Sequence, residues 1–279
     1  MLVWFFRMPD ESPPANGFFF SLGSYTLQVL HEMGAIVVFF ITAVLKLFHW
    51  PVHFGRIIEH VHFIGVRSLF VVALTGLFTG MVLGIQGYYT LVKFGSETVL
   101  GLMVALSLIR ELGPVLTALM ITGRAGSSIA AEIGIMRISE QIDALDTMNI
   151  DPMRFLVSPR LVAAVISFPL LTAIFDVIGI IGGYITGVMM LGINSGTYVA
   201  RMEMGVEMVD VRGGFIKSFF FALIVMTVCC YQGYTTDKHG DGHGARGVGS
   251  STTTAVVMSS VLVLIADYVI TSFLMGNTV

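Results

Sequence analysis

The chain has 279 residues, of which 55% are hydrophobic and only 12% are charged. Because soluble domains carry about 25% charged residues, this composition excludes an ordinary soluble protein and, with a mean hydropathy of +0.87, indicates a polytopic membrane protein. The formal net charge of −3 argues against nucleic acid as a partner. The two cysteines are neighbours within an apolar run, so no structural disulfide between them is expected.

The N-terminal part is expected to form a short lead and one helix outside the bundle. Residues 1–16 predict a poorly ordered lead without a removable signal peptide. Residues 18–48 are apolar but contain His31 and Glu32. Two alternatives follow: a span over 25–45 with both side chains buried in protein, or a helix lying in the membrane interface. The cost of ionisable groups at mid-bilayer favours the interfacial helix.

A segment rich in histidine follows, with histidines at positions 49, 53, 60 and 62. It could form a zinc site, or it could lie at headgroup depth together with Trp50 and the neighbouring basic residues. No complete ligand set of histidines and a carboxylate accompanies it, so the interfacial reading is favoured. His239 and His243 flank Asp241 in a polar loop, where a solvated loop is the more common case. No metal site is predicted.

Five apolar stretches are long enough to be transmembrane helices, and they cover residues 68–88, 98–121, 160–191, 215–234 and 251–275. The first and third stretches carry glycines at intervals of four, which let another helix approach closely. These glycines are Gly76, Gly80 and Gly84 in the first stretch and Gly179, Gly183 and Gly187 in the third. The segments 192–214 and 235–250 are expected to be polar loops. The sequence therefore predicts an all-α membrane protein with five spans.

Between the second and third spans the sequence predicts an amphipathic helix outside the bilayer, at about 128–148, after an exit turn at Gly123 and Arg124. Its apolar stripe is expected to comprise Ala131, Ile135, Ile138, Ile142 and Leu145. The roughly opposite face carries Glu132, Met136, Ser139, Glu140 and Asp143. That face could simply be solvated. Its position between two spans favours docking into a groove of a soluble protein, as the coupling helix of ABC transporters does.

Ionisable residues in or at the spans usually face a partner or a cavity. Here they are Glu97, Arg110, Glu111, Asp176 and Asp267. The alternative is a structural ion pair, for example between Arg110 and either Asp176 or Asp267. Glu97 differs because it lies at the outer mouth of the second span, where it could meet a lipid headgroup.

No catalytic constellation is found in the sequence. The motif G-x-x-x-x-G-K-[ST] is absent, so the chain is not expected to bind nucleotide phosphates in the P-loop manner. The protease motifs H-E-x-x-H and G-x-S-x-G are absent as well. We therefore expect a non-enzymatic subunit that takes its energy from another chain.

Lysines and arginines near the span ends predict the orientation. The side richer in them is expected to be cytoplasmic, and it holds Lys46, Arg56, Arg67, Arg124, Arg137, Arg154, Arg160, Lys238 and Arg246. The other side holds Lys93, Arg201, Arg212 and Lys217. The N-terminus, the helix at 128–148 and the loop at 235–250 would then face the cytoplasm.

Four long motifs, in order, resemble the MlaE/YrbE family of ABC-transporter permeases. They are GMVLGIQGY (80–88), ALSLIRELGPVLTALMITGRAGSSIAAEIGIMRISEQIDAL (105–145), DPMRFLVSPR (151–160) and GARGVGSSTTTAVV (244–257). The resemblance runs from about Val61 to the C-terminus. Residues 1–60 would then be the lead and interfacial helix, and residues 61–279 the permease domain.

The resemblance implies a homodimer in a bacterial inner membrane that moves glycerophospholipids between the inner and outer membranes and so maintains outer-membrane lipid asymmetry. The implied partners are a cytoplasmic ATPase that binds ATP and Mg²⁺, a periplasmic MCE-domain protein and often a STAS-domain protein, with no cofactor in this chain. The implied substrate-binding residues are Glu97, Gln86, Tyr88, Leu83 and Val99. The implied contacts with the ATPase are Arg124, Glu132, Met136, Arg137, Glu140 and Asp143.

Two other functions remain open at this point. An ion-coupled carrier or channel could use Glu97, Asp176 and Asp267 as a proton or cation relay. Transport that survives loss of the ATPase but collapses with the proton gradient would favour this alternative. A purely structural membrane anchor would instead tolerate substitutions in the cavity without a change in lipid flux.

Overall fold

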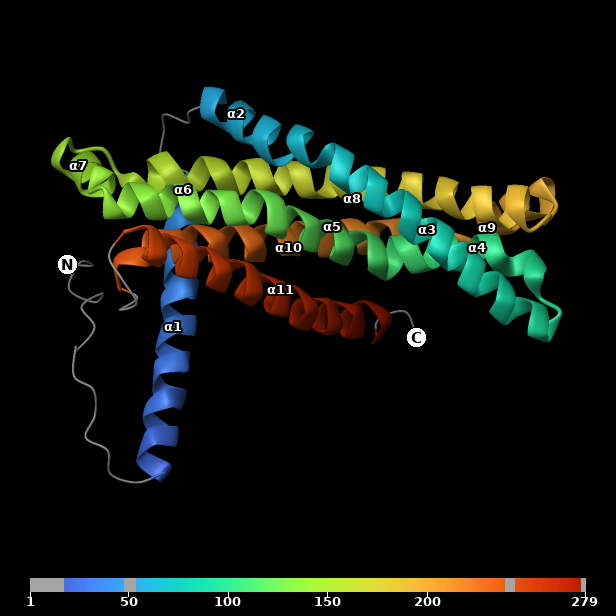
Figure 1. Ribbon diagram of the computed structural model, residues 1–279, viewed down its shortest axis with the longest axis horizontal. Coiled ribbons are helices and arrows are strands. Elements are labelled where there is room, and N and C mark those ends of the chain that lie inside the picture. The colour runs from blue at the N-terminus through green and yellow to red at the C-terminus, as the bar shows by residue number, and fades with distance from the viewer. Residues whose placement is uncertain (1–17, 48–53, 239–243, 277–279) are drawn as a thin grey trace.

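The computed structural model describes residues 18–47, 54–238 and 244–276, and within these ranges it contains helices and no strand. The helices form an elongated bundle, with α1 (Phe18–Leu47) roughly at right angles to the others (Figure 1). The predicted N-terminal lead at 1–16 and the histidines at 49, 53, 239 and 243 lie outside the described residues.

Five helical segments of the described chain are long and apolar enough to cross a membrane: Phe54–Phe94, Glu97–Ile138, Met153–Met190, Met208–Tyr234 and Ala245–Leu274. The prediction of an all-α protein with five spans is confirmed. The first segment contains α2 (Phe54–Ile64) and α3 (Leu69–Leu91), and the second contains α4 (Leu100–Ser107), α5 (Gly113–Ile121) and α6 (Ser127–Ile138). The other three contain α8 (Ser158–Tyr184), α10 (Met208–Tyr234) and α11 (Ala245–Gly276).

The second segment continues further than predicted. The exit turn expected at Gly123 and Arg124 is wrong, because residues 122–126 form a π-helical turn that joins α5 to α6 without a break. The physical reason is packing: Ile129, Ala130, Ile133 and Gly134 of α6 form a buried face against α10 and α11. Only the short helix α7 (Gln141–Thr147) stands apart, after a break at Glu140, whose φ is 57°.

The first and fourth spans also begin differently from the prediction. The segment expected to lie in the interface before residue 68 is partly helical, because α2 runs into α3 and packs along α8. The predicted polar loop at 192–214 contains α9 (Ser195–Gly205), whose first turn is capped by the Asn194 side chain accepting the N–H of Thr197 at 3.1 Å. α10 then starts at Met208, seven residues before the predicted start of the fourth span at 215.

Helix α10 lies at the centre of the bundle, where it packs against α5, α6, α8 and α11. Helix α3 packs mainly on α8, and this crossing depends on glycine. A Cβ atom on Gly80 would lie 1.8 Å from the carbonyl oxygen of Gly179, and one on Gly182 would lie 2.2 Å from that of Leu77. The glycine stripes predicted for the first and third spans therefore meet each other.

Helix α1 contacts the end of the bundle that carries α7. Its Phe39 ring packs against the rings of Tyr231 and Tyr234 at 5.6 and 5.9 Å between centroids, and Lys46 forms an ion pair with Asp151. α1 is not among the five candidate spans. An orientation roughly at right angles to the spanning helices (Figure 1) is the one that the interfacial alternative expects, and the location of α1 in the interface stays a prediction.

Candidate functional site

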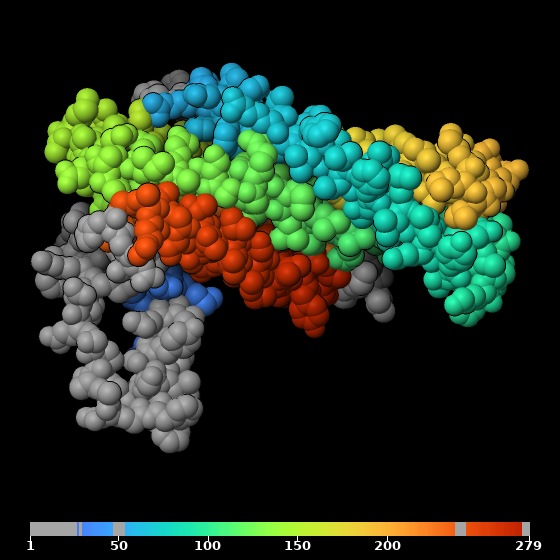
Figure 2. All heavy atoms as spheres, in the orientation of Figure 1, coloured from blue at the N-terminus to red at the C-terminus, as the bar shows by residue number. Residues whose placement is uncertain are grey.

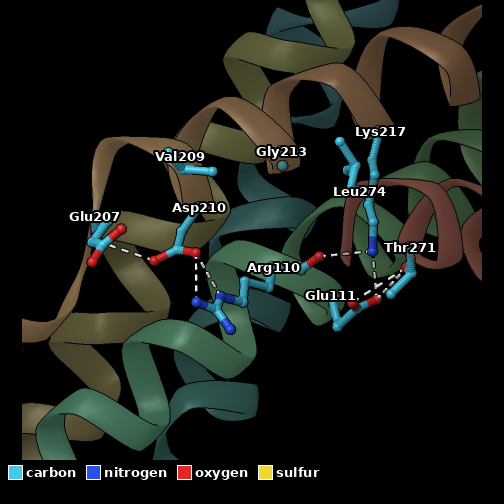
Figure 3. A pocket seen from close by; sticks show the side chains of 10 residues that line it. Arg110, Glu111, Glu207, Val209, Asp210, Gly213, Lys217, Thr271 and Leu274 are labelled. Carbon is cyan, nitrogen blue, oxygen red and sulfur yellow. Dashed lines mark hydrogen bonds and ion pairs between the residues drawn. The ribbon is translucent and has the colours of Figure 1, made fainter. Parts of the chain in front are cut away.

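A cluster of charged side chains lies inside the bundle, between the second, fourth and fifth spans (Figure 3). It borders a cavity of about 190 Å³ that is lined by Arg110, Glu111, Glu207, Val209, Asp210, Gly213, Gly214, Lys217, Thr271 and Leu274. We call this cavity the charged pocket. Its charged groups come from a π-helical turn at 108–112 and from the first turns of α10. π-helical turns are frequent at functional sites.

The start of α10 is fixed by a capping box between Glu207 and Asp210, in which each side chain accepts a backbone N–H of the other residue. Such a box satisfies donors that a helix N-terminus would otherwise leave free. It also holds the Asp210 carboxylate against the second span. There the Asp210 Oδ1 accepts the Arg110 Nε–H at 2.7 Å and lies 2.6 Å from Nη2.

Lys217 is the most enclosed cation of the charged pocket, with a side chain only 2% exposed. Its Nζ donates to Glu111 Oε2 at 2.5 Å and to the Arg110 carbonyl oxygen at 2.8 Å, and it lies 2.9 Å from Asp267 Oδ1. Thr271 donates to Glu111 Oε1 at 3.3 Å from the side of α11. Lys217 therefore connects three spans through one ammonium group.

The Arg110 carbonyl is available to Lys217 because of a proline. In an α-helix this oxygen would accept the N–H of residue 114, four positions later, but Pro114 has no N–H. A buried carbonyl without a donor costs free energy comparable to a lost hydrogen bond. The Lys217 ammonium supplies the missing donor from the neighbouring helix.

The pocket can accept charged groups of both signs. Two cations, Arg110 and Lys217, face four carboxylates, Glu111, Glu207, Asp210 and Asp267, which gives a formal sum of −2. Lys217 is enclosed, whereas the side chain of Arg110 is 42% exposed. A guanidinium that keeps exposed donors suits a phosphate oxygen. The carboxylate of Glu207, which is exposed at the rim, suits an ammonium group.

The structure corrects the predicted pairing of the ionisable residues. Arg110 is paired with Asp210 rather than with Asp176 or Asp267, and Asp267 is paired with Lys217. The reason is the early start of α10, which brings Asp210 into the bundle instead of onto an outer loop. Lys217, at the start of the predicted fourth span, reaches Glu111 and Asp267. Asp176 lies apart on α8, against Gly113, and within the described chain its buried Oδ1 has no hydrogen-bond partner.

Asp210 and Lys217 were missed as functional residues although the sequence carries a signal for them. Glu207 and Asp210 have the three-residue spacing of a capping box, which predicts a helix start at 208. Lys217 follows Asp210 by seven residues, two helical turns, so both side chains lie on one helix face. The apolar window alone does not reveal this, because hydropathy places Asp210 in the outer loop at 192–214 and Lys217 at the very start of the span at 215–234.

The five residues predicted to bind substrate lie elsewhere, near the outer turn between α3 and α4. Gln86 is exposed, Leu83 and Tyr88 pack partly against the core, and Glu97 and Val99 are half-buried in the turn before α4. The charged pocket does not include any of them. Their role in substrate binding stays a prediction.

The residues predicted to contact an ATPase lie at the opposite end of the second span, on α6, on α7 and in the turn before α6. Glu132 pairs with buried Arg160 at 2.9 Å, so its carboxylate is engaged within the chain. Arg137 binds Asp143 and Asp237, both at 2.8 Å, and thereby connects α7 to the segment after α10. Met136 is half-buried, and Glu140 is exposed.

The predicted apolar stripe of this region is partly wrong. Ile142 is buried as expected, but Ile135 is 56% exposed, and the buried face of α6 runs through Ile129 and Ile133 instead. Helix α7 presents Asp143 and Asp146, together with the exposed side chains of Glu140 just before it and Met148 just beyond it. These residues, rather than α6, form the acidic outer surface of this end.

The fold and the charged pocket define a class: a helical integral membrane protein with polar groups enclosed between its spans. The chain belongs to the MlaE permease family, because the family model described as Permease MlaE matches residues 57–273.

Individual relatives agree with this assignment. The chain is 45% identical over 251 residues to a probable ABC transporter permease protein of Rickettsia bellii, covering 90% of this chain and 95% of that protein. It is 44% identical over 225 residues to the intermembrane phospholipid transport system permease protein MlaE of Haemophilus influenzae, covering 80% and 84%. It is 35% identical over 230 residues to the chloroplastic protein TRIGALACTOSYLDIACYLGLYCEROL 1 of Arabidopsis thaliana, covering 82% and 64%.

Proposed function

We propose that this chain is the permease subunit of an ABC transporter that moves glycerophospholipids between an inner and an outer membrane. Family membership supports a permease, and the relative in Haemophilus influenzae is named for intermembrane phospholipid transport. The observation that carries the proposal is the charged pocket, which places the exposed guanidinium of Arg110 between spans whose outer surfaces are apolar.

A phospholipid suits this combination of groups. Its phosphate would bind Arg110, and an ethanolamine ammonium group would meet Glu207 at the rim. Its acyl chains would lie on the uncovered surface of α11, which crosses the face of the bundle in Figure 2. Large apolar side chains are exposed there: Val257, Val261, Leu264, Ile265, Tyr268 and Phe273. A second copy on a two-fold axis would close the cavity, and Glu97 would stand at its outer mouth.

A separate cytoplasmic ATPase would supply the energy and would hold ATP and Mg²⁺, because this chain has no P-loop motif. The end of the bundle that carries α7 holds Arg56, Arg137 and Arg160, and by the positive-inside rule these arginines support a cytoplasmic location for it. The outer end would then meet a periplasmic MCE-domain protein. A STAS-domain protein would complete the complex at the cytoplasmic side of a bacterial inner membrane.

The arrangement of Glu97, Asp176 and Asp267 does not favour an ion-coupled carrier. Asp267 is paired with Lys217, Asp176 lies against Gly113, and Glu97 begins the outer turn before α4. They belong to separate sets of contacts, whereas a relay needs neighbouring groups.

Replacing Arg110 with glutamine should lower phospholipid transport at least about tenfold, since a charge-assisted hydrogen bond contributes about 1.5–3 kcal/mol. Transport between donor and acceptor vesicles by the complete complex measures the effect. R201Q, which removes an exposed cation of α9, serves as the control. R110K keeps the charge but loses the forked geometry, so it should be intermediate. If R110Q folds and transports phospholipid at the wild-type rate, the charged pocket does not bind the substrate.

Reversing the charges of Glu140 and Asp146 should weaken co-purification of the ATPase at least about tenfold, because like charges across an interface are strongly unfavourable. These carboxylates are exposed, unlike that of Glu132, which binds Arg160. E203K, on the exposed surface of α9 at the other end, is the matched control. An intact complex with E140K/D146K would show that this face does not dock the ATPase.

A further inference from the structure

A second group of cations lies on the surface where α2, α3 and the turn before α6 meet. Arg124 donates through Nη1 to Ser68 Oγ and through Nη2 to the Phe63 carbonyl oxygen, both at 2.8 Å. Its Cζ is 4.9 Å from the centroid of the Phe63 ring, and the Cζ of Arg67 is 5.7 Å from the same centroid. Arg67 is exposed, and the two guanidiniums repel each other. We call Arg67 and Arg124 the arginine pair.

No carboxylate among the described residues balances the arginine pair. Neither residue forms an ion pair within the described ranges. The sequence explains why, since no aspartate or glutamate occurs at positions 60–96 or 112–131. The part of α8 that α2 packs against carries none at 152–175 either. Two neighbouring cations in a partly apolar setting are stabilised when an anion joins them. No carboxylate of the described ranges supplies that anion, and a headgroup outside the chain can.

The depth of the arginine pair in the membrane indicates which kind of anion it binds. Residues 68–87 contain no charged side chain, and 20 residues of helix rise about 30 Å, which is the thickness of the hydrocarbon layer. Arg67 therefore lies at the boundary with the headgroups. The neighbouring side chains of Val66, Leu69 and Phe70 are exposed by 58%, 43% and 72%. An occupant needs an anionic head at the arginines and an apolar body along α3.

We propose that the arginine pair binds the phosphate of an anionic glycerophospholipid in the leaflet at the α7 end, at a site separate from the charged pocket. Basic pockets between transmembrane helices bind anionic headgroups in this way. Arg124 lies 14 residues after Arg110 on the same continuous helix, which is about 21 Å along the axis. The bound lipid would join α2, α3 and α6 at their common contact and would not be transported.

The test is native mass spectrometry of the full-length, delipidated permease titrated with phosphatidylglycerol and, separately, with phosphatidylethanolamine. R67Q should weaken phosphatidylglycerol binding at one site per chain by about tenfold, the effect of one charge-assisted phosphate contact. Phosphatidylethanolamine should bind R67Q and the wild type alike. The matched control is K93Q, which removes an exposed cation from the other end of the same span.

Two further measurements distinguish failure of this lipid site from failure of the proposed transport function. R110Q should leave this lipid bound even if it empties the charged pocket, so failure of the transport proposal would not affect the result. Arg67 makes no hydrogen bond within the described chain apart from its helix backbone, so R67Q should fold, and R67Q/R124K should bind no more tightly than R67Q. Equal phosphatidylglycerol binding by R67Q and the wild type would overturn the proposal, as would complete displacement of the lipid by millimolar inorganic phosphate.

Discussion

Replacing Lys217 with methionine is expected to destabilise the permease by about 3–5 kcal/mol, the cost of removing one partner from a buried ion pair. Methionine keeps most of the aliphatic stem but removes the ammonium group. Glu111 and Asp267 then lose their common cation, and the Arg110 carbonyl loses the donor that replaces the missing N–H of Pro114. Denaturant or thermal unfolding of the detergent-purified chain, followed by the loss of helical circular dichroism, measures the effect.

Two comparisons make this result specific. K93M removes an exposed lysine at the end of the first span and should change the free energy of unfolding by less than about 0.5 kcal/mol, as is usual for surface substitutions. Adding E111Q and D267N to K217M should restore part of the lost stability, because the uncompensated charges are then removed. Equal stability of K217M and K93M would contradict the network described for the charged pocket.

Replacing Gly80 with alanine is expected to have an even larger effect, above about 4 kcal/mol, where only severe packing conflicts are found. The added Cβ atom would lie 1.8 Å from the carbonyl oxygen of Gly179 and 2.5 Å from its carbonyl carbon. Both are backbone atoms, so no side chain can turn away, and α3 must separate from α8. The yield of monodisperse protein after detergent extraction, together with its unfolding temperature, measures the damage.

A graded series of glycine variants provides the controls. G84A should be milder, since its nearest neighbour is the Thr186 side chain at 3.1 Å, and G249A should be tolerated, since nothing lies within 4 Å. All three changes add one methyl group to a helical glycine, so helix propensity acts equally in each. A G80A chain as stable as G249A would show that the α3–α8 contact is looser than described.

The spans could be predicted from the sequence because the bilayer demands long apolar stretches. The glycine stripes could be assigned to close contacts for the same local reason, since a four-residue interval marks one helix face. The structure adds that the two stripes meet each other at Gly80 and Gly179. Pairing of this kind is a tertiary property that one helix does not reveal.

The charged pocket was only half predictable. Arg110, Glu111 and Asp267 were recognisable as ionisable residues inside apolar windows, but their partners were not. Asp210 and Lys217 lie near the end of an apolar stretch, where hydropathy does not distinguish an outer loop from a capped helix that enters the bundle. Similarly, the buried face of α6 was assigned to the wrong residues. The same amphipathic pattern is compatible with a helix that lies in solvent and with a helix that packs against other parts of the protein.

The continuity of the second span has a mechanical consequence. Forty-two residues from Glu97 to Ile138 form a rod about 63 Å long at 1.5 Å per residue. A tilt of about 5° around its midpoint would displace each tip by nearly 3 Å, but Arg110, about 11 Å from the midpoint, by only about 1 Å. The charged pocket thus lies close to the point about which this helix would tilt. Its ion pairs can persist while the outer turn at Glu97 moves in response to a force applied at the Ile138 end of the helix.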